Sequence, residues 1–199
     1  MKICFITSTR ADFGLLKNVL IKAKNKRKFK IKLIVSGTHF SKKFGLTFKE
    51  INQSNMNINN KIIINYNSKE PENTSNTMTK CLNESTKIFK DLKPDLVVIL
   101  GDRYEILAFA LSAYISRIPI AHIHGGEVTK GSLDDAFRHS ITKLSHLHFV
   151  ANKTYKNRVI QLGENPKNVY VVGGLGADSI FNTKLISKKE IEKKYKIKF

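Results

Sequence analysis

The sequence predicts an α/β protein built on a doubly wound parallel sheet. Two observations predict this class. Short apolar segments recur along the 199 residues without the alternation of a half-exposed strand, as expected for strands that are buried on both faces. Segments with helical character separate them. Strict alternation of strand and helix favours parallel strands joined by helical crossovers.

The expected strands are short apolar segments, which favours strands over buried helices. They cover residues 2–7, 30–36, 61–66, 95–100, 119–124, 147–151 and 169–172. In open α/β sheets ligands bind outside the carboxyl ends of such strands. The residues that follow each strand are therefore the ones to search for a functional site.

The expected helices lie at residues 13–24, 44–52, 76–92, 104–116, 135–144, 154–162 and 177–181. The clearest is 76–92, in which Met78, Cys81, Ser85 and Phe89 share one face at helical spacing. Pro94 ends it, because proline disfavours helical backbone in the residue before it. The Asn-rich residues 52–60 and the segment 67–76 are expected to be surface loops.

The chain is expected to hold one domain at residues 1–183 and the start of a linker or second domain at 184–199. Ser187 and Glu190 form a capping-box pattern that opens a short charged helix. The last residues, 196–199, resemble the beginning of another strand. We therefore expect a second domain that the chain does not include.

Composition narrows the possible partners. The formal net charge of +19 comes mostly from lysine spread along the chain, which favours a solvated surface that attracts small anions over a nucleic-acid site. No apolar segment is long enough to span a membrane, and the N-terminus lacks a signal-peptide pattern. Two cysteines, Cys4 and Cys81, without a CxxC motif, fit a cytoplasmic protein with reduced thiols.

Two nucleotide-binding patterns are absent from the sequence. The first turn has no GxGxxG pattern, so a dinucleotide cofactor is not expected. A P-loop pattern is also missing, which argues against hydrolysis of a nucleoside triphosphate. Gly174 precedes an expected helix, where its backbone admits a phosphate or sugar or simply forms a tight turn. We expect no cofactor.

Polar residues crowd the ends of the first and fourth expected strands. Arg10 is a candidate clamp for a phosphate, and the alternative is a salt bridge with Asp12. Asp102 and Arg103 are adjacent, so one either serves a substrate or neutralises the other. Glu105 follows one step further on and is expected to be structural.

Two histidines end the fifth expected strand. His122 and His124 lie on one side of it, which is metal-ligand geometry if a carboxylate such as Glu127 joins them. The same spacing recurs at His146 and His148, so it is weak evidence, and we expect no metal.

Four charged residues open the next expected helix. Asp134 and Asp135 begin it, where one of them is accounted for by capping of free N–H groups. Arg138 and His139 lie close enough to pair with these carboxylates or orient them. Acids, bases and cations in one place are typical of acid–base chemistry on an anionic substrate.

These motifs together resemble the hydrolysing UDP-N-acetylglucosamine 2-epimerases. The resemblance rests on GDRYE at 101–105, IAHIHGGE at 120–127 and DDAFRHSITKLSH at 134–146, with TRADFG at 9–14 and GGLGA at 173–177. It runs over essentially the whole chain. It implies two Rossmann-like domains in the glycosyltransferase-B arrangement, with the substrate in the cleft between them and this chain as the N-terminal domain.

The resemblance also implies a reaction. UDP is eliminated to give a 2-acetamidoglucal, and water then adds to release the free 2-epimeric sugar, with no redox cofactor. The product commonly enters sialic acid or related pathways. The partner implied is a UDP-sugar, its exact substituents left open, and the full-length enzyme is expected to be a homo-oligomer. Alternatives are a non-hydrolysing 2-epimerase, a glycosyltransferase of the same fold, or a basic module that binds anions or nucleic acid.

Carried onto this sequence, the resemblance implies catalytic roles for Asp102 and Asp134, with Asp135 beside them. Many relatives have Glu at the position of His124, so either this imidazole or Glu127 takes the role of acid or base. The residues expected to bind substrate are Arg10, His39, Arg103, Gly125, Gly126, Arg138, His139 and Gly174.

Overall fold

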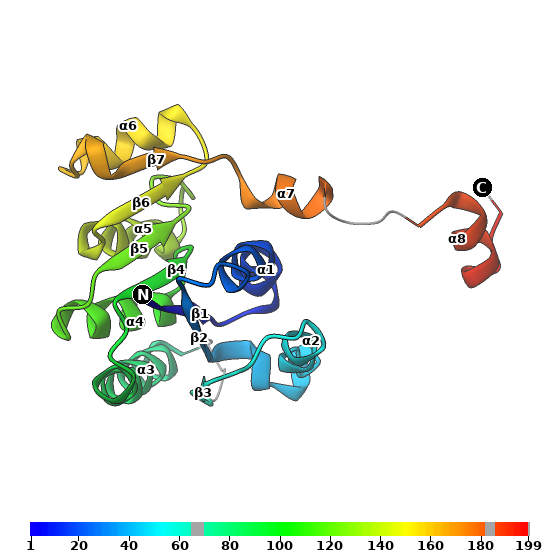
Figure 1. The fold of residues 1–199 in the computed structure, drawn as a ribbon, viewed down its shortest axis with the longest axis horizontal. Coiled ribbons are helices and arrows are strands. Elements are labelled where there is room, and N and C mark those ends of the chain that lie inside the picture. Colours follow the sequence, from blue (N-terminus) through cyan, green and yellow to red (C-terminus); the bar gives the residue numbers. More distant parts are fainter. Residues whose placement is uncertain (65–69, 182–185, 199) are drawn as a thin grey trace.

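In a computed structural model, which describes residues 1–64, 70–181 and 186–198, the strands form one parallel sheet (Figure 1). Its order is β3-β2-β1-β4-β5-β6-β7. The strands are β1 (Lys2–Thr7), β2 (Lys30–Val35), β3 (Asn60–Lys61), β4 (Leu96–Leu100), β5 (Ile120–Ile123), β6 (Leu147–Val150) and β7 (Val169–Val171). The predicted fold class is confirmed.

Helices cover both faces of the sheet. They are α1 (Arg10–Lys24), α2 (Phe48–Gln53), α3 (Pro71–Leu92), α4 (Tyr104–Ile115), α5 (Leu133–Leu144), α6 (Lys153–Gln161), α7 (Leu175–Phe181) and α8 (Lys188–Tyr195). Short 3-10 turns lie at Gly37–Phe40, Lys42–Phe44 and Pro166–Asn168. Figure 1 shows α1, α2 and α7 toward one side of the sheet and α3 and α4 toward the other.

Strand β1 shows why its segment is continuously apolar. Cys4 and Ile6 belong to the core beneath α3 and α4, while Ile3 and Phe5 belong to the core beneath α1. Both faces of the strand are therefore removed from water, and the hydrophobic effect stabilises apolar residues on each. A third, smaller core lies under α6.

Three element predictions need correction. Helix α3 begins at Pro71, so residues 71–76 are helical and not a loop; proline fits the first turn of a helix because its missing N–H has no partner to lose there. Residues 67–69 of that predicted loop lie outside the described residues. The third expected strand, 61–66, is shorter: β3 ends at Lys61, residues 62–64 adopt no strand, and Asn65 and Tyr66 lie outside the described residues. The helix expected at 44–52 begins at Phe48, after Gly45 at φ +82° ends a 3-10 turn.

The C-terminal segment is confirmed in its capping box. Ser187 accepts the N–H of Glu190, whose carboxylate accepts the N–H of Ser187 in return. Helix α8 buries no residue, and Figure 1 shows it away from the sheet. The expected boundary at 183/184 lies outside the described residues and stays a prediction, as does the second domain. Ile197 and Lys198 adopt no strand.

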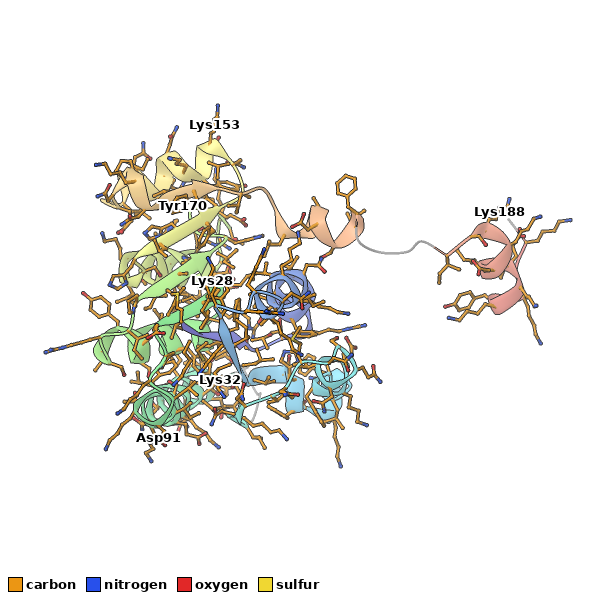
Figure 2. All side chains as sticks on the ribbon, viewed as in Figure 1. Lys28, Lys32, Asp91, Lys153, Tyr170 and Lys188 are labelled. Carbon is orange, nitrogen blue, oxygen red and sulfur yellow. The ribbon has the colours of Figure 1, made fainter. Side chains whose placement is uncertain are left out.

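The basic side chains are dispersed. Figure 2 shows Lys153 on α6 and Lys188 at the start of α8 on separate parts of the molecule. Both are exposed, as is Lys28 in the turn before β2. Within the described ranges, no helix has the length and apolar character needed to cross a membrane.

Candidate active site

The strand order reverses between β1 and β4, which is the point where open α/β sheets bind ligands. Gly101 ends β4 in a left-handed turn, with φ +83°. Its N–H donates to the carbonyl oxygen of Ile123, at the end of β5, over 3.1 Å. The polar segments that follow β4 and β5 are therefore held at one edge of the sheet.

An ion pair between Asp102 and Arg138 joins the turn after β4 to helix α5. The Arg138 side chain is only 7% exposed, and its Nη2 also donates to the hydroxyl of Thr129 over 3.1 Å. Asp135 lies one helical turn earlier, 3.7 Å from Nη1 of Arg138, and accepts the backbone N–H of Thr129 over 2.7 Å. One guanidinium thus holds two carboxylates and the loop between β5 and α5.

The other two polar residues at the start of α5 complete this group. The N-cap is Ser132, whose hydroxyl accepts the N–H of Asp134 over 3.2 Å, so the expectation that an aspartate caps this helix is wrong. The reason is that the helix begins at Leu133, two residues before the expected start at 135, so Ser132 takes the N-cap position. His139 places Nε2 3.6 Å from Asp135. Asp135 thus contacts both Arg138 and His139, whereas the carboxylate of Asp134 accepts the hydroxyl of Ser132 over 3.1 Å.

His124 and Glu127 form a second pair on the loop that follows β5. The Nδ1 atom of His124 lies 3.1 Å from Oε1 of Glu127, and the two side chains are 18% and 29% exposed. His124 has φ +67°, a left-handed conformation that costs a non-glycine residue of order 1–3 kcal/mol. Strain of this kind is concentrated at functional sites, where surrounding contacts maintain it.

His122 serves the fold. Its ring is fully buried, with Nε2 donating to the carbonyl oxygen of Gly101 over 2.8 Å and Nδ1 3.2 Å from the hydroxyl of Thr142. Burial lowers the pKa of His122 to about 3, so the ring is neutral. Gly125 packs on this ring: a Cβ there would lie 3.1 Å from His122 Nδ1. His122 and His124 are therefore not a matched pair of metal ligands.

Gly126 packs against helix α6. Its φ is +78°, and a Cβ at this position would lie 2.5 Å from the carbonyl oxygen of Tyr155. The carbonyl oxygen of Gly126 accepts a hydrogen bond from Arg158. The paired glycines therefore allow the loop that carries His124 to pass closely between α5 and α6.

Arg103 pairs with Glu105 and not with its neighbour Asp102. Nε of Arg103 lies 2.5 Å from Oε1 of Glu105, whose side chain is completely buried. The alternative in which Asp102 and Arg103 neutralise each other is wrong, because Arg138 of α5 pairs with Asp102 instead. Glu105 has the structural role expected for it, because its buried carboxylate holds the guanidinium of Arg103 directly after β4.

The turn after β1 is stabilised by its own side chains. Asp12 accepts the backbone N–H groups of Ser8 and Thr9 over 3.1 and 2.9 Å and forms the capping box of helix α1 with the N-cap residue Thr9. Arg10 is largely exposed and pairs with Glu50 of α2 at 3.0 Å. The alternative in which Arg10 pairs with Asp12 is therefore wrong, because the Asp12 carboxylate is engaged at the N-terminus of α1.

His39 follows β2 and is fully buried. Its Nε2 lies 3.1 Å from the hydroxyl of Thr7, and its Nδ1 lies 2.8 Å from that of Thr47. Burial lowers its pKa, an effect that the charges of Asp12 and Glu50 partly offset. Gly174 lies before α7, with no atom within 4 Å of a Cβ built on it. The structure does not bring these two residues into contact with the pairs after β4 and β5.

Sequence reasoning missed Thr129, which contacts both Asp135 and Arg138. It lies in a loop without a recognisable motif, so no signal pointed to it. Glu50 was missed for the same reason, as its partner Arg10 is forty residues away in the sequence. Within the described ranges, no cluster of three or more histidine, cysteine or acidic side chains could hold a metal ion.

Unpartnered buried atoms concentrate at this edge. Among the described side chains, the buried nitrogen and oxygen atoms without a hydrogen-bond partner belong to Glu105, His124, Arg138, His139 and His148. All but His148 lie in the segments after β4 and β5. Buried polar groups without partners are rare in proteins and costly, which marks this region as a candidate ligand site.

Known proteins resemble this chain over nearly its whole length. Residues 21–199 match the family model described as UDP-N-acetylglucosamine 2-epimerase. A Campylobacter jejuni protein named GDP/UDP-N,N'-diacetylbacillosamine 2-epimerase (hydrolyzing) is 42% identical over 197 residues, covering 99% of this chain and 51% of that protein. Polysialic acid biosynthesis protein P7 of Escherichia coli is 40% identical, covering 98% and 50%.

Solved structures show the same fold. The Neisseria meningitidis UDP-GlcNAc 2-epimerase bound to UDP-GlcNAc superposes with a TM-score of 0.81 at 20% identity, over 91% of this chain and 49% of that one. The class is thus a Rossmann-like α/β domain of the glycosyltransferase-B type. The chain belongs to the UDP-N-acetylglucosamine 2-epimerase family. It spans about half the length of the curated relatives it matches.

Proposed function

We propose that this chain is the N-terminal half of a hydrolysing 2-epimerase that acts on a UDP-2-acetamido sugar. The observation that carries the proposal is the set of carboxylates, imidazoles and guanidiniums in the segments after β4 and β5, where the Asp102–Arg138 pair joins the turn after β4 to α5 and His124 contacts Glu127. Relatives at 42% and 34% identity are named hydrolysing 2-epimerases, which supports the reaction type. The second domain would complete the substrate cleft.

The reaction divides into two redox-neutral steps. In the first, a base takes the proton from C2 of the sugar, the C–H electrons form a C1–C2 double bond, and UDP leaves C1 with the electron pair of the C–O bond. In the second, water adds its hydroxyl to C1, and C2 receives a proton on the opposite face. The sum is UDP-sugar and water giving UDP and the free 2-epimeric sugar.

The residues divide between these tasks. Asp102, Asp134 and Asp135, with the pair His124 and Glu127, supply proton-transfer groups and the carboxylates that orient them. The groups proposed to bind the departing diphosphate are Arg10, Arg103, Arg138 and His139. Of these, Arg10 and Arg103 have the more exposed side chains, at 72% and 28%. Gly125, Gly126 and Gly174 would let the backbone approach the ligand.

The proposal is tested with the complete enzyme, UDP-N-acetylglucosamine and UDP-N,N'-diacetylbacillosamine, with products identified by NMR. We expect UDP and a free 2-epimeric sugar from one of the two. A product that retains UDP would show a non-hydrolysing epimerase. An enzyme that turns over neither sugar but binds nucleic acid in a salt-sensitive manner would contradict the enzymatic function.

A control follows from the length of the chain. The 199-residue chain alone should show little turnover, because it spans about half of its relatives and would lack half of the cleft. Robust activity from the isolated chain would contradict the two-domain site.

We also propose a cytoplasmic location. Cys4 and Cys81 are both free and buried, and burial raises each thiol pKa to about 12. Reduced, unpaired cysteines are typical of proteins in a reducing compartment. Localisation of a tagged protein by fractionation would test this.

A further inference from the structure

The two histidines at the end of β5 differ in how their ring nitrogens are used. His122 donates from Nε2 to the carbonyl oxygen of Gly101, and its Nδ1 contacts the hydroxyl of Thr142. His124 contacts Glu127 through Nδ1 at 3.1 Å, and its buried Nε2 has no hydrogen-bond partner. Both ring nitrogens of His122 therefore have partners, whereas one ring nitrogen of His124, only two residues away, has none.

The backbone holds His124 in place for this role. Its N–H donates to the carbonyl oxygen of Phe149 in β6 over 3.0 Å, so the residue is tied to the sheet although its φ is +67°. The next two residues are Gly125 and Gly126, which allow the loop to pack on His122 and on α6. A strained histidine that is held by its backbone N–H and by a side-chain partner is the arrangement expected of a functional residue.

We infer that His124 transfers the C2 proton through Nε2 and that Glu127 is the positioning residue that fixes its tautomer. The inference rests on the proposed function and deepens it. A carboxylate only accepts hydrogen bonds, so the contact with Glu127 places the hydrogen of the neutral ring on Nδ1. The lone pair is then on Nε2, the nitrogen without a protein partner.

Geometry favours the imidazole over the carboxylate as the base. The buried Nε2 of His124 has no protein partner, whereas the Glu127 carboxylate is in contact with Nδ1 of the same ring. In the step, the C2–H bond breaks and Nε2 gains the proton. The C–H electrons form the C1–C2 double bond, and UDP leaves with the C–O pair. Glu127 then faces an imidazolium, whose positive charge it stabilises.

The tautomer is tested by long-range ¹H–¹⁵N NMR on the 199-residue chain at pH 8. We expect His124 to carry its hydrogen on Nδ1 and His122 to carry its hydrogen on Nε2, so that the second ring is an internal reference. Glu127→Gln should remove the preference at His124 and leave His122 unchanged. Finding His124 with its hydrogen on Nε2 would overturn the inference.

The catalytic role is tested in the complete enzyme. His124→Gln should lower kcat about 100-fold or more with little change in KM, and the released sugar of the wild type should carry solvent deuterium at C2. Glu127→Gln should lower kcat by a smaller factor, with partial recovery in Glu127→Asp. Lys130→Gln is the matched control, because Lys130 is exposed in the same loop and has no proposed role.

The outcomes separate the inference from the proposed function. If the wild type releases UDP and free sugar while His124→Gln keeps a third or more of its kcat, the inference is wrong and the epimerase function stands. If the wild type has no turnover, the proposed function fails and the inference fails with it. Near-UV circular dichroism of each variant shows whether it has folded.

Discussion

Polar residues follow β1 and β2 just as they follow β4 and β5, yet the two halves of the sheet, on either side of the switch point between β1 and β4, use them differently. After β1 and β2, Asp12 belongs to the capping box of α1, and His39 is buried between two threonine hydroxyls. After β4 and β5, Asp102 reaches a different helix, and His124 retains an unpartnered nitrogen. After β1 and β2 both ring nitrogens of the buried histidine have partners, whereas after β4 and β5 a buried ring nitrogen has none and is available to a ligand. A polar residue after a strand is therefore not sufficient evidence for a site.

The largest effect is expected at Asp102. Asp102→Asn should lower kcat of the complete enzyme by about 10²–10⁴-fold, because it removes a charged partner of Arg138 within the acid–base group. Steady-state kinetics and urea unfolding check this together. Asp91→Asn is the matched control, since Asp91 is exposed on α3 (Figure 2). A near-normal rate in the Asp102 variant would mean that the pair only ties β4 to α5.

A large effect on stability is expected in the half of the sheet that contains β1 and β2. His39→Ala should reduce the free energy of unfolding by roughly 2–4 kcal/mol, because it leaves a cavity and two buried hydroxyls without their partner. The kcat/KM of the folded variant should stay within a few-fold of the wild type. A selective rise in KM without loss of stability would instead show that His39 binds substrate.

Mild acid should lower the free energy of unfolding, because the protein buries neutral histidines in both halves of the sheet. His122 has its pKa lowered to about 3 by burial, so below about pH 6.5 the unfolded chain binds a proton that the folded chain does not. Stability should therefore fall as the pH drops from about 6.5 toward 3 and stay constant above about 7. Between pH 7.5 and 5 the loss from His122 alone is about 2 kcal/mol.

Urea unfolding at several pH values measures this loss. His39 and His148 add to it in the same direction, because burial is the main cause of the lowered pKa of each. Unfolding free energies that are equal at pH 7.5 and 5 would contradict the neutral buried rings.

The smallest effect is expected at Thr129, the residue that links the His124 loop to α5. Thr129→Val removes the hydroxyl that accepts from Arg138 but keeps the backbone N–H bond to Asp135. We expect kcat to fall several-fold, equivalent to about 1 kcal/mol for one hydrogen bond, with recovery in Thr129→Ser. Equal rates in the valine and serine variants would show that the hydroxyl does not position the guanidinium.

Much of the fold could be predicted because the signals are local. Strand segments such as 2–7 are apolar on both faces. Ser187 and Glu190 indicate the start of a helix within four residues. The predicted boundaries are wrong where one residue type suits two kinds of local structure. Pro71 was assigned to a loop, although proline is equally suited to the first turn of a helix.

By itself, the sequence determined the α/β class, the strands, and the polar segments from which the site is made, because hydrophobic periodicity and motif chemistry are properties of neighbouring residues. Only the tertiary structure decided the partners. It paired Asp102 with Arg138, Arg103 with Glu105 and Arg10 with Glu50, and it gave opposite roles to His122 and His124. The physical reason is that an ion pair or a ring hydrogen bond depends on which strand ends lie side by side, and the sheet order sets that.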